Sequence, residues 1–132
     1  MMDLLLDTHV LLWAAGAEER LSRRAHHAIV ENSGNLWLSP VSLQEILALR
    51  VKGRIATSDP VRIWFSEVTA RLGLREAAMT HEVALASGEF TLVHKDPADR
   101  LLVATARVYG LTLVTADRLL LKSKACPMIR AA

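Results

Sequence analysis

The sequence predicts an α/β fold, a three-layer α/β/α sandwich with a mainly parallel sheet of four to five strands. Two observations predict this class. Short apolar runs of strand length alternate along the whole chain with longer segments that carry helix start and stop signals. The chain has 132 residues, of which 52% are hydrophobic, and it contains no low-complexity tract. We therefore expect one domain, residues 1–132, with a sizeable core.

The predicted strands are short and mostly apolar. The first, Leu4–Leu6, contains no polar residue, as expected for a strand that is covered on both faces. The fourth also contains β-branched residues, which favour strands. In chain order the predicted strands are Leu4–Leu6, Leu36–Leu38, Leu74–Ala77, Leu111–Val114 and Met128–Ile129.

The predicted helices are placed by their ends. Ser-Pro and Asp-Pro pairs mark starts, because Ser and Asp cap a helix and Pro suits its first position. Glycines mark several ends. In chain order the predicted helices are Thr8–Ala15, Leu21–Glu31, Pro40–Lys52, a segment opened by Ser58-Asp59-Pro60 that ends near Leu72, Thr80–Ser87, and Pro97–Tyr109.

Composition restricts the compartment more than the function. The only cysteine, Cys126, cannot form an internal disulfide, which fits a reducing compartment. No stretch reaches the roughly 18 consecutive apolar residues that indicate a membrane span, and the first apolar run lacks the preceding basic region of a signal peptide. We expect a cytoplasmic protein that does not associate with membranes.

The charge distribution favours a polyanionic substrate only in the last third of the chain. The net charge of +2 is too small to indicate nucleic acid by itself. From Lys95 onward, however, seven basic residues accompany three acidic ones. An ordinary solvated surface explains this excess about as well. Three of these basic side chains are candidate phosphate contacts because they lie beside acidic residues: Lys95, Arg100 and Arg118.

Two carboxylates directly follow predicted strands. Asp7 ends the first strand, and Asp117 follows the fourth after Thr115-Ala116. If these strands are parallel, both carboxylates lie at the edge where α/β sheets bind ligands. The alternatives are a helix cap for Asp7 and a turn residue for Asp117.

A third carboxylate, Glu45, lies in a predicted helix that is apolar nearly all round until Arg50. A carboxylate on a buried helix needs a partner, which favours a functional role. Residues 42–45 (SLQE) also match a capping box. Against that alternative, Ser39-Pro40 already marks the helix start.

Asp96 and Asp99 occupy the start of the last long helix. Pro97 suits the first helical position, so Asp96 becomes the N-cap and Asp99 the third helical residue. At this spacing the two side chains point to the same side. Capping explains Asp96, and the helix dipole would favour Asp99, so structural roles remain open for both.

Several carboxylates at one sheet edge would repel one another or gather a divalent cation. Oxygen ligands select Mg²⁺ or Mn²⁺ rather than zinc. Such a cation lowers the pKa of bound water and stabilises the charge on a displaced phosphate ester.

Four segments resemble the PIN-domain nucleases, and within that family the VapC-type toxins of bacterial toxin–antitoxin pairs. They are residues 5–13 (LLDTHVLLW), 42–46 (SLQEI), 96–106 (DPADRLLVATA) and 113–117 (LVTAD). Each motif is weak alone, but their order and spacing agree over essentially the whole chain. The resemblance implies a PIN-like sheet and a metal-dependent endoribonuclease toxin that hydrolyses RNA with a metal-activated water.

The resemblance also implies site residues and partners. The cofactor would be Mg²⁺, with Mn²⁺ as a substitute, and the partners are RNA, a small cognate antitoxin and a second copy of the chain. A non-catalytic metal- or phosphate-binding regulatory module is the alternative. The family's four acids fall on Asp7, Glu45, Asp99 and Asp117, with Asp96, Thr8 and Thr115 as neighbours.

Overall fold

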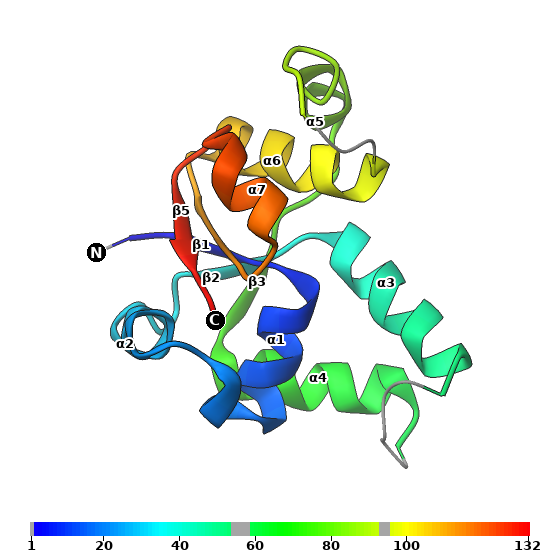
Figure 1. Ribbon diagram of the computed structural model, residues 1–132. Helices are drawn as coiled ribbons and strands as arrows, with labels where there is room; N and C mark the ends of the chain where they lie inside the picture. The colour runs from blue at the N-terminus through cyan, green and yellow to red at the C-terminus, as the bar shows by residue number, and fades with distance from the viewer. Residues whose placement is uncertain (1, 54–58, 93–95) are drawn as a thin grey trace.

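The computed structural model describes residues 2–53, 59–92 and 96–132 and contains a five-stranded sheet with helices on both faces (Figure 1). The strand order is β3-β2-β1-β4-β5, and every neighbouring pair is parallel. The predicted three-layer α/β/α class is confirmed, with five strands. They are β1 (Leu4–Leu6), β2 (Leu36–Leu38), β3 (Leu74–Glu76), β4 (Thr112–Thr115) and β5 (Met128–Arg130).

Most helices begin and end where their capping signals predict. Ser39 caps α3 with Pro40 next, and Asp96 caps α6 with Pro97 next. Gly110 ends α6 in the left-handed conformation (φ 69°), which glycine adopts without strain. The helices are α1 (Thr8–Gly16), α2 (Arg23–Glu31), α3 (Pro40–Val51), α4 (Val61–Leu72), α5 (His81–Ala86), α6 (Pro97–Tyr109) and α7 (Arg118–Ser123), with a 3₁₀ turn η1 (Glu18–Arg20).

The structure corrects the predicted helices in two respects. Helix α2 begins later than predicted, because Ser22 is its N-cap and accepts a hydrogen bond from the Ala25 N–H. The turn η1 and helix α7 were not predicted at all, because neither is long enough to show a helical period. Of the predicted helix start Ser58-Asp59-Pro60, Ser58 lies outside the described residues, and α4 begins at Val61, directly after Pro60.

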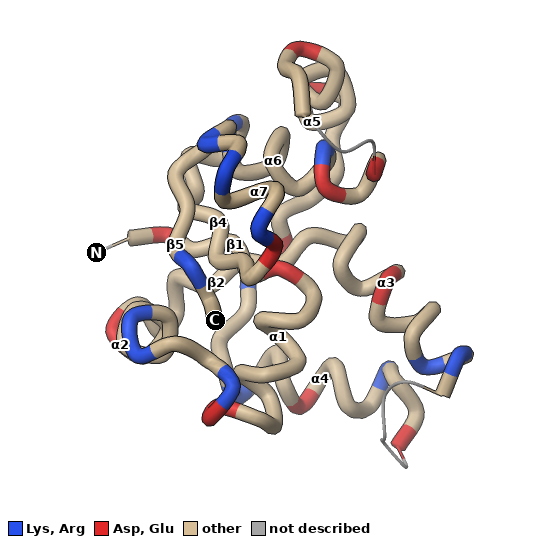
Figure 2. The backbone as a smooth tube through the Cα atoms, viewed as in Figure 1, with Lys and Arg blue, Asp and Glu red and all other residues tan. Residues whose placement is uncertain are grey.

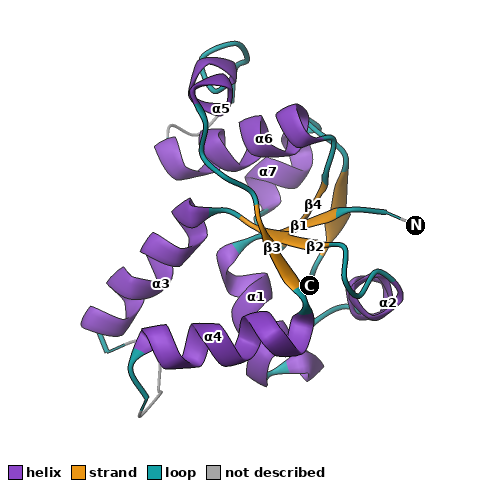
Figure 3. Cartoon of the chain, turned by 180° about the vertical axis from the view of Figure 1, so that it is seen from behind, coloured by secondary structure: helices purple, strands orange, loops and turns teal. Residues whose placement is uncertain are grey.

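The sheet has helices on both faces (Figure 3), and it separates the core into two layers of buried side chains. Leu4 and Leu6 point to one face and pack with apolar residues of α1, α2, α3 and α4. Leu5 and Leu113 point to the other face and pack with residues of α6 and α7. Successive strand residues point to opposite faces, so both layers require apolar side chains. No helix in the described part of the chain is long and apolar enough to cross a membrane.

Candidate active site at the carboxyl edge of the sheet

Asp7 directly follows β1, the central strand of the sheet, and is the N-cap of α1. Its Oδ1 accepts a hydrogen bond from the Thr8 backbone N–H at 2.7 Å. Its Oδ2 accepts one from the Thr115 hydroxyl, also at 2.7 Å. Thr115 ends β4, the parallel neighbour of β1, and its side chain is fully buried. The start of α1 and the end of β4 therefore hold the carboxylate at the carboxyl edge of the sheet.

Asp117 lies at the same edge, two residues after Thr115. Its backbone N–H donates to the Thr115 hydroxyl oxygen at 3.1 Å, which links it to Asp7 through one side chain. Its Oδ1 accepts hydrogen bonds from the N–H groups of Leu119 and Leu120. Asp117 is thus the N-cap of α7, rather than the turn residue that was the alternative to a functional role. Its other carboxylate oxygen keeps lone pairs for a further ligand.

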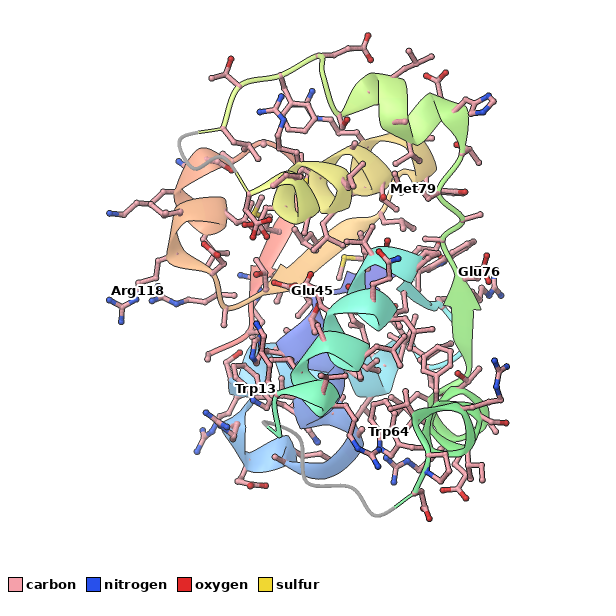
Figure 4. All side chains as sticks on the ribbon, turned by 90° about the vertical axis from the view of Figure 1, so that its right-hand side faces the viewer. Trp13, Glu45, Trp64, Glu76, Met79 and Arg118 are labelled. Carbon is pink, nitrogen blue, oxygen red and sulfur yellow. The ribbon has the colours of Figure 1, made fainter. Side chains whose placement is uncertain are left out.

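Glu45 reaches the site from α3. Helix α3 packs against α1 and α6, and Glu45 lies in its second turn. The Ser39 cap excludes the capping-box alternative for residues 42–45, because Ser39 is the N-cap and the helix begins at Pro40, two residues before Ser42. Figure 4 shows Glu45 near the middle of the face between α3 and the carboxyl ends of the strands.

The surroundings of Glu45 disfavour a charged carboxylate. Burial raises the pKa of Glu45 above its ordinary value, and the nearby Asp7 carboxylate raises it further. The Thr8 hydroxyl interacts with the Glu45 carboxyl and partly lowers this pKa. The Asp96 carboxylate raises the pKa of Glu45 further, and His9 lowers it. Glu45 is therefore within electrostatic range of carboxylates from two other elements.

Asp96 and Asp99 lie at the start of α6, as predicted. Asp96 is exposed, and its Oδ1 caps the helix by accepting from the Ala98 N–H at 3.0 Å. Asp99 is half-buried in the first turn. Besides capping α6, the Asp96 carboxylate lies within electrostatic range of Glu45 and contributes to its raised pKa. Figure 2 shows acidic positions at the starts of α1, α6 and α7 and along α3 around this edge.

The donor chemistry of this edge fits a hard divalent cation. The acids supply only oxygen donors, which suit Mg²⁺ or Mn²⁺, and the mutual repulsion at Glu45 is what a cation would relieve. Within residues 2–53, 59–92 and 96–132, no three His, Cys, Asp or Glu side chains converge tightly enough to hold a metal ion.

The three predicted phosphate contacts have different surroundings. Lys95 lies outside the described residues. Arg118 is exposed at the start of α7 and extends outward from it (Figure 4). Arg100 donates from Nη2 to the carbonyl oxygens of Ser87, at 2.8 Å, and Phe90, at 2.7 Å. Because its guanidinium donates to two main-chain carbonyls, we interpret Arg100 as a residue that stabilises the fold rather than one that contacts a substrate phosphate.

Replacing Glu45 by Gln should change the pH dependence of stability. A raised pKa means that folded Glu45 holds its proton more tightly than unfolded Glu45 does. The unfolded chain releases the proton first, so stability falls as pH rises from the ordinary glutamate pKa through the raised one. In EDTA, we expect E45Q to melt at a higher temperature than the original protein at pH 7, and the difference to shrink toward pH 4.

Thermal melts from roughly pH 4 to pH 8 measure this difference. E67Q, at an exposed position of α4, is the matched control and should follow the original protein. Parallel pH curves for E45Q and the original protein would contradict the crowding described at Glu45.

Comparison with known proteins gives one family. The sequence profile of the PIN domain matches residues 4–124. Ribonuclease VapC22 from Mycobacterium tuberculosis is 36% identical over 121 residues, covering 89% of each chain. A chain of the crystal structure of VapBC2 from Rickettsia felis, bound to a DNA fragment from their promoter, has a TM-score of 0.71 at 16% identity and full coverage of both chains. A chain of FitAcB from Neisseria gonorrhoeae has a TM-score of 0.63 at 15% identity over 96% of each.

Proposed function

This chain belongs to the PIN-domain family, and we propose on that premise that it is an endoribonuclease toxin of a toxin–antitoxin pair that uses Mg²⁺, or Mn²⁺ in its place. The resemblance of the four acidic segments to this family is confirmed by the profile match and by the 36% identical ribonuclease. The observation that carries the proposal is the Asp7 carboxylate, held at the end of the central strand and facing Glu45.

The acids divide into two groups in the proposed mechanism. Asp7 and Asp99 would bind the cation directly, and Glu45 and Asp117 would complete its shell directly or through water. A bound Mg²⁺ supplies a water of lowered pKa and offsets the charge on the displaced phosphate oxygen. Thr115 keeps the Asp7 carboxylate in one orientation, and the Asp117 cap limits the freedom of its own carboxylate. The expected products carry a 5′-phosphate and a 3′-hydroxyl.

Arg118 is the described side chain that best suits a phosphate contact. It follows Asp117 directly, is exposed, and extends outward at the same edge of the sheet. A single-stranded RNA whose scissile phosphate lay at the acids would place a neighbouring phosphate near this guanidinium. Lys95, adjacent to Asp96 in the sequence, remains a second candidate.

Two protein partners are part of the proposal. Helices α3 and α4 carry exposed apolar residues, Leu47 (46% exposed), Val51 (87%) and Ile63 (50%), and Leu43 and Phe65 line the groove between these helices. An apolar surface of this kind suits a protein interface. We propose that an antitoxin and a second copy of this chain cover the apolar surfaces, in the cytoplasm. A monomer in sedimentation at micromolar concentration would contradict the homodimer.

The ribonuclease is tested by incubating the purified chain with single-stranded RNA in Mg²⁺, in Mn²⁺ and in EDTA. We expect cleavage with either metal, none in EDTA, and recovery when metal is added back in excess. RNA that stays intact with both metals would contradict the ribonuclease function and favour the alternative, a non-catalytic binding module. Cleavage that persists in EDTA would contradict the proposed metal dependence.

A further inference from the structure

Two buried hydroxyl groups beside the acids have no hydrogen bond of standard geometry within the described residues. They are Thr8 Oγ1, in the first residue of α1, and Ser42 Oγ, in the third residue of α3. Thr8 is 1% exposed and Ser42 is fully buried. Buried hydroxyls in folded proteins nearly always have a partner, because water has been removed from them. Thr105, equally buried, shows the usual state: its hydroxyl donates to the Leu101 carbonyl at 2.6 Å.

Both hydroxyls belong to the elements that surround Glu45. Ser42 precedes Glu45 by three residues in α3, so the two side chains lie on the same face of the helix. Thr8 is the first residue of α1, directly after Asp7, and α1 packs against α3, the helix that carries Glu45. Both hydroxyls therefore come from the helix that carries Glu45 and from the helix packed against it.

We propose that Thr8 and Ser42 are positioning residues that hold the Glu45 carboxylate toward the cation. Their hydroxyls donate to this carboxylate, directly or through an ordered water that they share. Glu45 lies in the middle of α3 and reaches the other acids from a different element. Without hydrogen-bond donors nearby, its side chain would populate several rotamers. Donors behind a ligand restrict its orientation and commonly change metal affinity by about 10- to 100-fold. This inference rests on the proposed metal site.

A purely structural role for these hydroxyls predicts a different outcome. If the two side chains only fill space, replacing Thr8 by Val keeps the shape and removes an unsatisfied polar group, so stability rises and metal binding is unchanged. If they serve Glu45, the same variant weakens metal binding. Stability and metal affinity measured on the same protein therefore distinguish the two roles.

The experiment is a Mn²⁺ titration of the full chain, followed by the rise in melting temperature, with no RNA present. The variants are T8V and S42A, which lack the hydroxyls, and T8S, which keeps one while losing a methyl group. The matched control is T69V, because Thr69 Oγ1 is also buried without a partner in the described residues but belongs to α4, where Thr69 and Phe65 line a separate pocket. We expect the Mn²⁺ affinity to fall about 10-fold in T8V and in S42A, to stay within about 3-fold in T8S, and to be unchanged in T69V.

Each result supports or overturns the inference. Unchanged Mn²⁺ affinity in T8V and S42A overturns it, and so does T8S weakened as much as T8V, because the hydroxyl would then not be the active group. If T8V does not fold, S42A decides. If Mn²⁺ does not stabilise even the original protein, the proposed metal site itself is wrong. If only the further inference is wrong, the original protein binds Mn²⁺, and T8V and S42A bind it equally well.

Discussion

Replacing Asp7 by Asn should reduce RNA cleavage by about 10³-fold, equivalent to about 4 kcal/mol of transition-state stabilisation, while the protein still folds. The substitution removes one negative charge from the position that we propose binds the cation. Asn also caps helices well, so α1 keeps its start. The new amide oxygen can still accept from the Thr8 N–H, and the new amide N–H can donate to the Thr115 hydroxyl oxygen, so the contact between positions 7 and 115 is kept with its direction reversed.

Initial cleavage rates in Mn²⁺, with melting temperatures on the same samples, measure this effect. D3N is the matched control, because Asp3 precedes β1 at the opposite edge of the sheet and accepts a hydrogen bond from Trp37 Nε1. We expect D3N to cleave RNA as the original protein does. If D7N retained more than about a tenth of the activity, Asp7 would not be a direct metal ligand.

Replacing Arg100 by Met should lower the free energy of unfolding by about 2–3 kcal/mol, since hydrogen bonds from a charged donor each contribute about 1.5–3 kcal/mol. The guanidinium Nε and Nη2 both donate to the Ser87 carbonyl, and Nη2 also donates to that of Phe90. These bonds tie the end of α5 and the chain after it to α6. Methionine keeps much of the volume but leaves both carbonyls without this donor.

Thermal melting measures this loss, and for a domain of this size we expect the melting temperature to fall by about 10 °C. Arg107 provides the control. The Arg100 guanidinium lies over the Phe90 ring, 5.2 Å from its centroid, and the Arg107 guanidinium lies over the same ring at 4.6 Å, but the hydrogen bond from Arg107 to the Ala125 carbonyl is exposed. R107M should cost less than about 1 kcal/mol. Equal losses in the two variants would show that the contacts with Phe90, rather than the hydrogen bonds, carry the stability.

The local signals in the sequence predicted the elements well because each depends on a few adjacent residues. Ser39-Pro40 and Asp96-Pro97 begin α3 and α6 as expected, and Leu4–Leu6 forms a strand covered on both faces. Helix α7 escaped prediction because it has only six residues, and burial of Leu120 rather than a periodic pattern holds it in place. Its cap, Asp117, could therefore not be told from a turn residue.

The candidate site was only partly predictable. The sequence placed Asp7 and Asp117 after strands, and Glu45 in a helix, but it did not single out Ser42 as functional. The spacing of three residues from Glu45 was a usable signal, yet the same spacing suggested a capping box. Only the Ser39 cap in the structure removes that alternative. Arg100 likewise resembled a phosphate contact until its bonds to Ser87 and Phe90 were visible.

By itself, the sequence determined the fold class, the elements, and the acids that follow the strands and begin α6, because strand burial and helix capping are decided by neighbouring residues. The tertiary structure decided which of these side chains meet. The Thr115 hydroxyl reaches Asp7 across 108 residues because β1 and β4 are adjacent parallel strands, and Asp96 acts on Glu45 because α6 packs against α3. No local pattern contains that pairing, since it depends on how buried strands and helices pack across the whole chain.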